Sequence, residues 1–371
     1  MNIILTNEKT LEIACFSDVH IGHRRTPTTN ILKSLDNAFK DSDFNDLDII
    51  FIAGDFYDRL LDLPNNDALL ADMWISTFIK KCSKHNVILR VLEGTPSHDR
   101  KQPQRFISIA EMTKTDIDIK YMDALSIEYI DSLDINVLYI PDEWNSPEET
   151  LKEVKSLLNS KGLTKVDFAV MHGQFEYQLP SHIKNIPRHS SEEYLKLVKY
   201  LIFIGHIHVF SEYKRIIAPG SIDRLSHNEE GPKGHIRVSI DKKGIYKAKF
   251  IENELATIYK TIDISNYEIS KSLSIVSSII EEVPNYSYVR IKGNRDHPIF
   301  SNIQELSKNY PLINISTNII KDDEVSEILD ISEIPDYVPL IINKDNIEEL
   351  LLSKIDVINK DSYITAIKEC I

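Results

Sequence analysis

The stretch LDIIFIAGDFYD at residues 47–58 places a nearly continuous apolar run before a Gly-Asp turn. A short run rich in β-branched and aromatic residues is typical of a strand buried on both faces. Comparable runs recur through the first 250 residues, and segments with helical periodicity separate them. We therefore predict strands at residues 11–16, 47–53, 87–92, 135–140, 166–171 and 200–204. Helices are predicted at residues 28–41, 67–85, 104–112, 146–160 and 191–198, which together indicate a layered α/β domain.

The second part of the chain has a different pattern. Two alternating strands are predicted at residues 235–240 and 246–251. A small βαβαβ unit follows, with strands and helices alternating at residues 256–262, 266–282, 288–292, 300–308 and 312–317. The acidic residues 321–336 indicate a linker, and two short amphipathic helices are expected at residues 346–355 and 363–371. The predicted domains are therefore residues 1–250, 251–320 and 321–371.

The composition is that of an ordinary globular protein, with 42% hydrophobic and 27% charged residues. The three cysteines have no paired spacing, which argues for a reducing compartment and against a disulfide framework or a cysteine zinc site. The N-terminus lacks the pattern of a secretory signal, and no apolar run approaches the roughly 20 residues of a membrane span. We expect a cytoplasmic protein with no membrane partner.

The net charge of −14 argues at first against a nucleic-acid partner, because phosphate binding usually needs a basic surface. The acidic excess is unevenly distributed. Residues 251–371 hold 11 Lys and Arg against 21 Asp and Glu, so most of the negative charge lies there. Bound divalent cations would offset part of the remainder. The acidity therefore does not exclude DNA as a partner.

Five predicted strands are followed by Asp or His side chains, at the edge where α/β sheets normally place their sites. Taken alone, each such residue is more often a turn residue or a surface group than a metal ligand. Together they offer oxygen and imidazole ligands without a thiolate, which suits manganese, iron or zinc in a dinuclear centre. The segments are Ser17-Asp18-Val19-His20, Gly54-Asp55-Phe56-Tyr57-Asp58, Gly94-Thr95-Pro96-Ser97-His98-Asp99, His172-Gly173 and Gly205-His206-Ile207-His208.

The order DxH, GDxxD, a GNHD-like turn, H and GHxH resembles the signature of calcineurin-like metallophosphoesterases. That resemblance implies a β-sandwich flanked by helices and two divalent metal ions, manganese first, with magnesium, iron or zinc as alternatives. It assigns His98 as the acid that protonates the leaving oxygen or as the residue that orients the scissile phosphate. We expect Asp99 to orient His98 rather than to bind metal. The implied ligands are Asp18, His20, Asp55 and His208 for one ion, and Asp55, His172 and His206 for the other.

One position departs from the family pattern. The family has Asn before the catalytic His, where it binds the second metal, whereas this chain has Ser97. We carry Ser97 over as a metal ligand, with a water molecule or Thr95 as alternatives. A serine hydroxyl is a poorer ligand than an amide oxygen, so the second metal is expected to bind loosely.

Within this superfamily the chain more closely resembles the SbcD-type nuclease subunits. The segment Ala218-Pro219-Gly220-Ser221 is similar to their PGS turn, and Asp223-Arg224 follows it. Their architecture also has a small capping domain and a C-terminal segment that docks on a coiled-coil ATPase. The resemblance implies a duplex exonuclease and single-strand endonuclease of DNA repair or recombination. It also implies a homodimer, and an SbcC-like ATPase bound through the tail.

Basic residues lie beside the first three motifs, and we predict that they bind DNA phosphates. They are Arg24, Arg25, Arg59, Arg100, Lys101 and Arg105. The alternative is that they are ordinary solvated surface charges. Two other functions stay open: a phosphatase or cyclic-nucleotide phosphodiesterase with the same metal site, and a non-catalytic scaffold with a degenerate one.

Overall fold

The computed structural model describes residues 10–61, 65–142, 145–179 and 186–320. Within these residues, every helix and strand given below belongs to one compact unit of the chain. The predicted linker and tail helices lie outside the described residues. The division into three domains stays a prediction.

The first six-stranded sheet has the strand order β12-β11-β1-β2-β3-β4. The four strands from β1 to β4 are parallel, and β11 and β12 add antiparallel pairs at one edge. The carboxyl ends of β1, β2 and β3 therefore meet at one edge of the sheet. The strands are β1 (Leu11–Phe16), β2 (Ile49–Ala53), β3 (Ile88–Leu92), β4 (Ile119–Met122), β11 (Gly234–Ile240) and β12 (Tyr246–Glu252).

The second six-stranded sheet has the order β5-β6-β7-β8-β10-β9. Its central strands β6, β7, β8 and β10 are parallel, and β5 and β9 pair antiparallel at the two edges. The strands are β5 (Ser126–Ile130), β6 (Ile135–Ile140), β7 (Val166–His172), β8 (Val198–Gly205), β9 (Ser211–Tyr213) and β10 (Ile216–Ala218).

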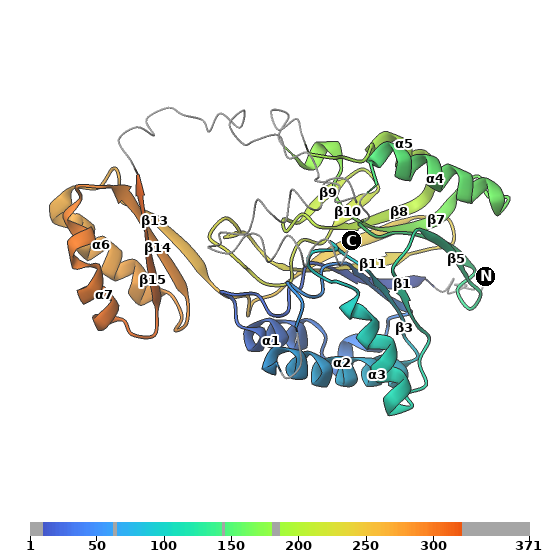
Figure 1. The fold of residues 1–371 in the computed structure, drawn as a ribbon, viewed down its shortest axis with the longest axis horizontal. Coiled ribbons are helices and arrows are strands. Elements are labelled where there is room, and N and C mark those ends of the chain that lie inside the picture. Colours follow the sequence, from blue (N-terminus) through green and yellow to red (C-terminus); the bar gives the residue numbers. More distant parts are fainter. Residues whose placement is uncertain (1–9, 62–64, 143–144, 180–185, 321–371) are drawn as a thin grey trace, which may run out of the picture. The chain divides into compact units, whose positions relative to one another are not determined.

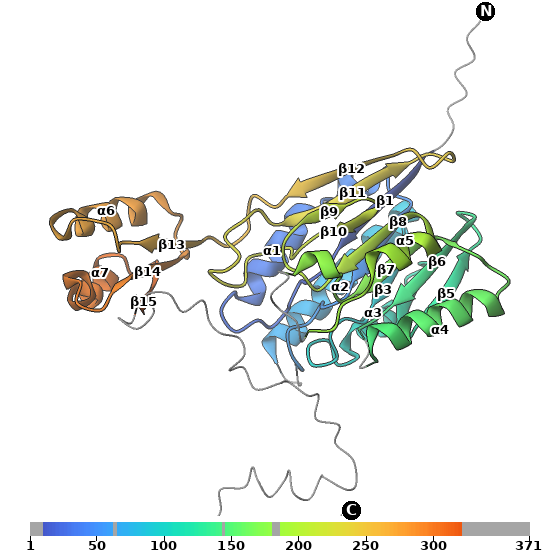
Figure 2. The same ribbon diagram turned by 90° about the horizontal axis from the view of Figure 1, so that it is seen from above.

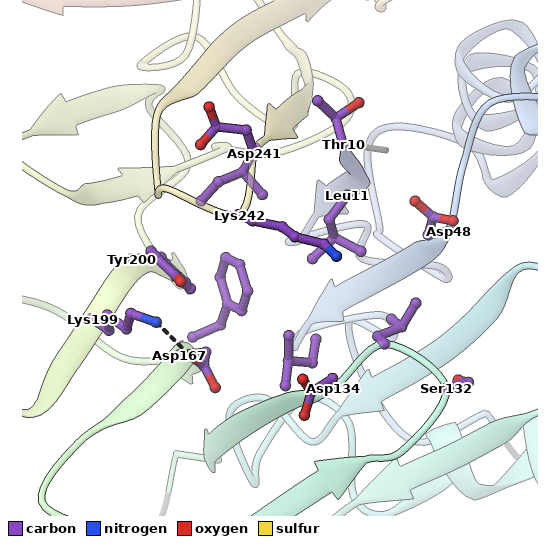
Figure 3. Close-up of a pocket in the computed structure, with 14 residues that line it drawn as sticks. Thr10, Leu11, Asp48, Ser132, Asp134, Asp167, Lys199, Tyr200, Asp241 and Lys242 are labelled. Carbon is purple, nitrogen blue, oxygen red and sulfur yellow. Dashed lines mark ion pairs between the residues drawn. The ribbon is translucent and has the colours of Figure 1, made fainter. Parts of the chain in front are cut away.

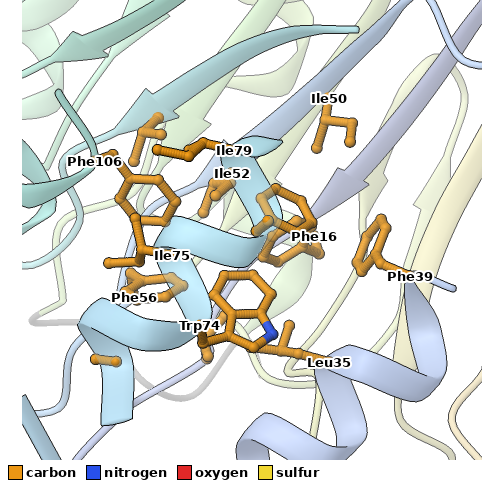
Figure 4. Packing of buried hydrophobic residues seen from close by; sticks show 14 of the residues in the cluster. Phe16, Leu35, Phe39, Ile50, Ile52, Phe56, Trp74, Ile75, Ile79 and Phe106 are labelled. Carbon is orange, nitrogen blue, oxygen red and sulfur yellow. The ribbon is translucent and has the colours of Figure 1, made fainter. Parts of the chain in front are cut away.

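The side chains of β2 show how these sheets are layered. Every residue of β2 is buried, and alternate residues enter different cores, as the twofold period of a strand requires. Phe51 faces the second sheet, where its ring centroid lies 5.9 Å from that of Phe203. Ile50 and Ile52 face the opposite way, into a core formed with the helices (Figure 4). The continuous apolar run in the sequence thus reflects burial on both faces.

Helices cover the outer face of each sheet (Figures 1 and 2). On the first sheet, Trp74 stacks on Phe78 at 4.6 Å, and Phe78 meets Phe16 of β1 edge-on at 6.2 Å. On the second sheet, Val154 and Tyr194 pack against strand residues such as Ala169. The helices are α1 (Thr28–Ala38), α2 (Asn66–His85) and α3 (Arg105–Thr113) on the first sheet, and α4 (Pro147–Ser160) and α5 (Ser191–Leu197) on the second.

A smaller three-stranded parallel sheet, ordered β13-β14-β15, has a core of its own. Val289 and Ile291 of β14 face the same side and pack with Val276 and Leu306 from its two helices. Its elements are β13 (Tyr259–Asp263), α6 (Ile269–Glu282), β14 (Tyr288–Asn294), α7 (Ile303–Asn309) and β15 (Asn314–Ile320).

The α/β class predicted from the sequence is confirmed, and the metallophosphoesterase form of the sandwich stays a prediction. Each strand predicted in the first 250 residues is present, with ends shifted by up to two residues. Four strands were not predicted: β4 and β5 are partly exposed and lack a clear alternation, and β9 and β10 have three residues each. None of the described helices is long and apolar enough to cross a membrane.

Candidate metal centre

The loops that follow the parallel strands bring the predicted ligand residues together. Asp18 and His20 follow β1, and Asp55 follows β2. His172 ends β7, and His206 and His208 follow β8. The potential ligand atoms lie within 4.8 Å of one another in three groups: Asp18, His20 and His208; His20, Asp55 and His98; and Asp55, His172 and His206. These buried Asp and His groups could hold a metal ion.

The backbone at these positions is unusual. The φ angles of Asp18, His20, Asp55 and His206 are 51°, 55°, 51° and 97°, a region that residues other than glycine seldom occupy. Each such residue costs on the order of 1–3 kcal/mol, and such residues cluster at functional sites. Hydrogen bonds hold the first loop against the second: the amides of Val19 and His20 donate to the carbonyl of Asp55 at 2.8 and 3.1 Å.

Two glycines allow the loops to approach this closely. A Cβ atom on Gly54 would lie 2.3 Å from Nδ1 of His172. A Cβ on Gly94 would lie 2.1 Å from the backbone nitrogen of Asp55. Neither distance is compatible with a side chain, so the glycines at these strand ends are required for packing as well as for the turn.

Three imidazoles are oriented by acceptors outside the cluster. Nδ1 of His172 donates to the carbonyl of Ala53 at 2.8 Å, and Nδ1 of His208 faces Oε1 of Glu229 at 3.1 Å. Nδ1 of His20 lies 3.3 Å from Oδ1 of Asp58. Each ring therefore turns Nε2 inward, and the Nε2 atoms of His20 and His208 are 3.1 Å apart. Metal-binding histidines show this arrangement, in which the second nitrogen is held by a carbonyl or carboxylate.

The charges of the site are strongly coupled. Burial opposes ionisation of Asp55, yet His172 and His98 hold the pKa of its carboxyl well below the usual range. Burial likewise opposes protonation of His172, and Asp55 nevertheless raises its pKa to about 10. Burial and the neighbouring His172 lower the pKa of His206 to about 4. Carboxylates and imidazoles this close together form a donor set that fits a divalent cation, which would replace the imidazole protons on binding.

Ser97 is not brought into the cluster, which corrects the first assignment at the departing position. Its side chain is exposed, and its carbonyl accepts a bond from Nε of Arg100. Thr95 is the residue whose hydroxyl lies in the site, 3.2 Å from Oδ2 of Asp55 and 3.3 Å from Nε2 of His172. Thr95, the second residue of this turn, therefore faces the cluster, whereas Ser97, the fourth, does not.

Asp99 does not orient His98. Its buried carboxylate accepts hydrogen bonds from the amides of Tyr57 and Gly94 at 2.8 and 2.7 Å, so it joins the second and third motif loops. Nδ1 of His98 instead lies 3.1 Å from Oδ2 of Asp55. Burial, with the charge of Asp55, raises the pKa of Asp99 well above the usual range. Asp99 is thus a structural residue of the loops.

Two of the basic residues predicted to bind DNA are engaged in ion pairs. Nε of Arg105 donates to Asp72 at 2.6 Å, which ties α3 to α2, and Nζ of Lys101 lies 3.2 Å from Asp123. Both pairs reduce the availability of these cations for a ligand. Arg24, Arg25 and Arg100 are exposed and Arg59 is half-buried, and DNA binding by them stays a prediction.

Two acidic residues of the site were not identified from the sequence. Glu229 holds His208, and its other oxygen accepts from Nζ of the buried Lys233 at 2.8 Å. Asp142, after β6, lies close enough to Asp55, His98 and His172 to interact with their charges. Asp142 follows a predicted strand, so its position was a usable signal, whereas nothing in the spacing of Glu229 indicated its role.

A pocket of about 560 Å³ opens at the other ends of the strands (Figure 3). Leu11, Phe168 and Tyr200 contribute to its lining, and Lys199 pairs with Asp167 there at 3.6 Å. These residues lie at the starts of β1, β7 and β8, whereas the candidate metal ligands lie at or after the ends of the same strands. The pocket is therefore separate from the candidate metal centre.

No family model matches the chain, and no curated protein matches it either. Among solved structures, TT1561 of Thermus thermophilus is 10% identical, with a TM-score of 0.37 over 65% of this chain and 99% of its own. A second structure is 14% identical, with a TM-score of 0.38 over 65% of this chain and 100% of its own. Likeness at this level identifies no family.

Proposed function

We propose that this chain is a calcineurin-like metallophosphoesterase that hydrolyses DNA phosphodiesters, as an SbcD-type nuclease subunit does. The observation that carries the proposal is the inward convergence of three Nε2 atoms on the carboxylates of Asp18 and Asp55 at the ends of parallel strands. The order of the motifs along the chain agrees with that family and supports the choice of reaction.

The ligand sets are those that the family resemblance implies. Asp18, His20, Asp55 and His208 would hold one divalent cation, and Asp55, His172 and His206 the other. Asp18, His20 and His208 form one of the three groups, and Asp55, His172 and His206 form another. Bound manganese, or magnesium, iron or zinc in its place, would activate water and neutralise charge on the phosphate. The carboxylate of Asp18 is kept in position by the amide of His206, which donates to it at 2.9 Å.

His98 is the residue best placed to meet a substrate. Its side chain is 37% exposed, whereas those of His20 and His172 are 2% and 0% exposed. Its ring centroid lies 5.0 Å from that of His20, so it borders the cluster from the open side. A proton donor at this place would assist departure of the leaving oxygen.

The partners are proposals of the same kind. Arg24, Arg25 and Arg100 are exposed cations on the first and third motif loops and suit contacts with DNA phosphates. A homodimer and a coiled-coil ATPase bound through residues 321–371 follow from the family resemblance. An intracellular site of action is proposed from the unpaired cysteine spacing. A phosphatase or cyclic-nucleotide phosphodiesterase would use the same cluster, and a scaffold would retain it without turnover.

The test is manganese-dependent degradation of end-labelled duplex and single-stranded DNA, with a chromogenic phosphodiester assayed in parallel. His98→Ala should lower the rate about 10²-fold or more, the scale of a lost proton donor, and His85→Ala on α2 serves as the matched control. If only the chromogenic phosphodiester is cleaved, the substrate is a small phosphate ester rather than DNA. Metal binding without cleavage of any substrate would favour the scaffold.

A further inference from the structure

The hydroxyl of Thr95 lies next to two candidate metal ligands, Asp55 and His172. Its Oγ1 lies 3.2 Å from Oδ2 of Asp55 and 3.3 Å from Nε2 of His172. Those two atoms are themselves 3.2 Å apart. The three atoms therefore form a nearly equilateral triangle.

The three atoms can all bind a cation through lone pairs. Nδ1 of His172 donates to the carbonyl of Ala53, so Nε2 is the ring atom that faces Oδ2 of Asp55 and the Thr95 hydroxyl. Metal binding requires the neutral form of the ring, whose Nε2 then offers a lone pair. The carboxylate of Asp142 hydrogen-bonds with Thr95, so the hydroxyl can direct its proton to Asp142 and its lone pair to the cation.

The spacing suits an octahedral ion. Adjacent ligands about 2.0–2.3 Å from such an ion are about 2.8–3.3 Å apart, which matches all three edges of the triangle. The Thr95 hydroxyl is also held firmly, because its own amide donates to Oδ1 of Asp55 at 2.5 Å. The absence of a Cβ on Gly94 is what lets the turn come this close to Asp55.

We propose that Thr95 supplies a direct hydroxyl ligand to the cation held by Asp55, His172 and His206, and that Asp142 accepts the hydroxyl proton in a hydrogen bond. The inference rests on the proposed function and deepens it. Thr95 then takes the place of the Asn that the resembling family uses, and Ser97 has no part in binding. Because a neutral hydroxyl is a weak ligand, this cation is the more weakly bound of the two.

The experiment counts manganese ions bound per chain, by electron paramagnetic resonance of the free ion and by calorimetry, without substrate. Wild type should bind two ions. Thr95→Val keeps the shape of the side chain and removes its oxygen, so it should lower the affinity for the second manganese ion at least tenfold. Thr95→Ser retains the hydroxyl, and its affinity for that ion should be within threefold of wild type. Ser97→Ala, the matched control in the same turn, should leave both ions unchanged. Asp142→Asn should lower the affinity for the second manganese ion about tenfold. This variant tests the site if Thr95→Val fails to fold.

The outcomes separate the two proposals. If wild type binds two ions and neither Thr95→Val nor Asp142→Asn alters the second, Thr95 is not a ligand and the proposed function stands. A loss with Ser97→Ala, and none with Thr95→Val, would overturn the inference in favour of Ser97. If wild type binds one ion, there is no second cation for Thr95 to hold. If wild type binds no divalent cation, the proposed function itself fails.

Discussion

The contact between Glu229 and His208 permits a quantitative prediction. Oε1 of Glu229 lies 3.1 Å from Nδ1 of His208, and the Glu229 side chain is 12% exposed. Glu229→Gln keeps the size of the side chain and removes its charge. Loss of an outer partner to a metal-binding histidine weakens metal affinity about 10–100-fold, or roughly 1.4–2.7 kcal/mol. We expect that loss for the ion held by Asp18, His20 and His208.

The same change elsewhere provides the control. Glu128 is 9% exposed and pairs with the buried Arg90, so Glu128→Gln also removes a charge from a buried ion pair. Both variants should be less stable to urea in the metal-free state, because each leaves a buried cation with a weakened partner. Only Glu229→Gln should change the manganese dissociation constant measured by calorimetry. Equal affinities in wild type and Glu229→Gln, or equal losses in both variants, would refute the role of Glu229 in orienting His208.

Two further predictions concern stability. Nε of Arg90 on β3 donates to Glu128 on β5 at 2.8 Å, so Arg90 links the two sheets. Arg90→Met alone should lower the free energy of unfolding by about 3 kcal/mol, and adding Glu128→Leu should recover most of it; additive losses in urea titrations would contradict this. Burial and the charge of Arg237 lower the pKa of His235 to about 3, below the usual 6.5. The unfolded chain therefore binds the extra proton between these pH values, and stability should fall as the pH drops from about 6.5 towards 3. His235→Gln should reduce that fall by about 2–3 kcal/mol at pH 4.5, and unfolding curves that fall equally steeply in both proteins would exclude His235 as a cause.

The positions of the candidate metal ligands along the chain were largely predictable. Asp55 follows a strand in which all five residues are buried, and such a run leaves a clear signal in the sequence. The carboxyl ends of β1, β2 and β3 meet at one edge because these strands are parallel neighbours, and β7 and β8 do the same in the second sheet. A strand-end Asp or His was thus a good guide to the cluster.

The partners of those ligands were less predictable. The turn after β3 contains Arg100 and Lys101 with φ angles of 49° and 59°, and no sequence rule gave that conformation. This turn places the Thr95 hydroxyl at the cluster and leaves Ser97 exposed. The same turn sends Asp99 to the amides of Tyr57 and Gly94, away from His98. A residue type that can bind metal is visible in the sequence, but the direction in which a turn orients its side chain is not.

By itself, the sequence determined the α/β class, the strands that lead into the site and the Asp and His residues available there, because burial and strand period are local properties of the chain. The tertiary structure alone decided which hydroxyl reaches Asp55 and which acid holds His208. Glu229 lies 21 residues after His208, and its role follows from the folding of the intervening segment, through which Lys233 and Ser221 also reach it. Such contacts join segments that are brought together by the path of the backbone, and the types of side chain in the sequence do not predict that path.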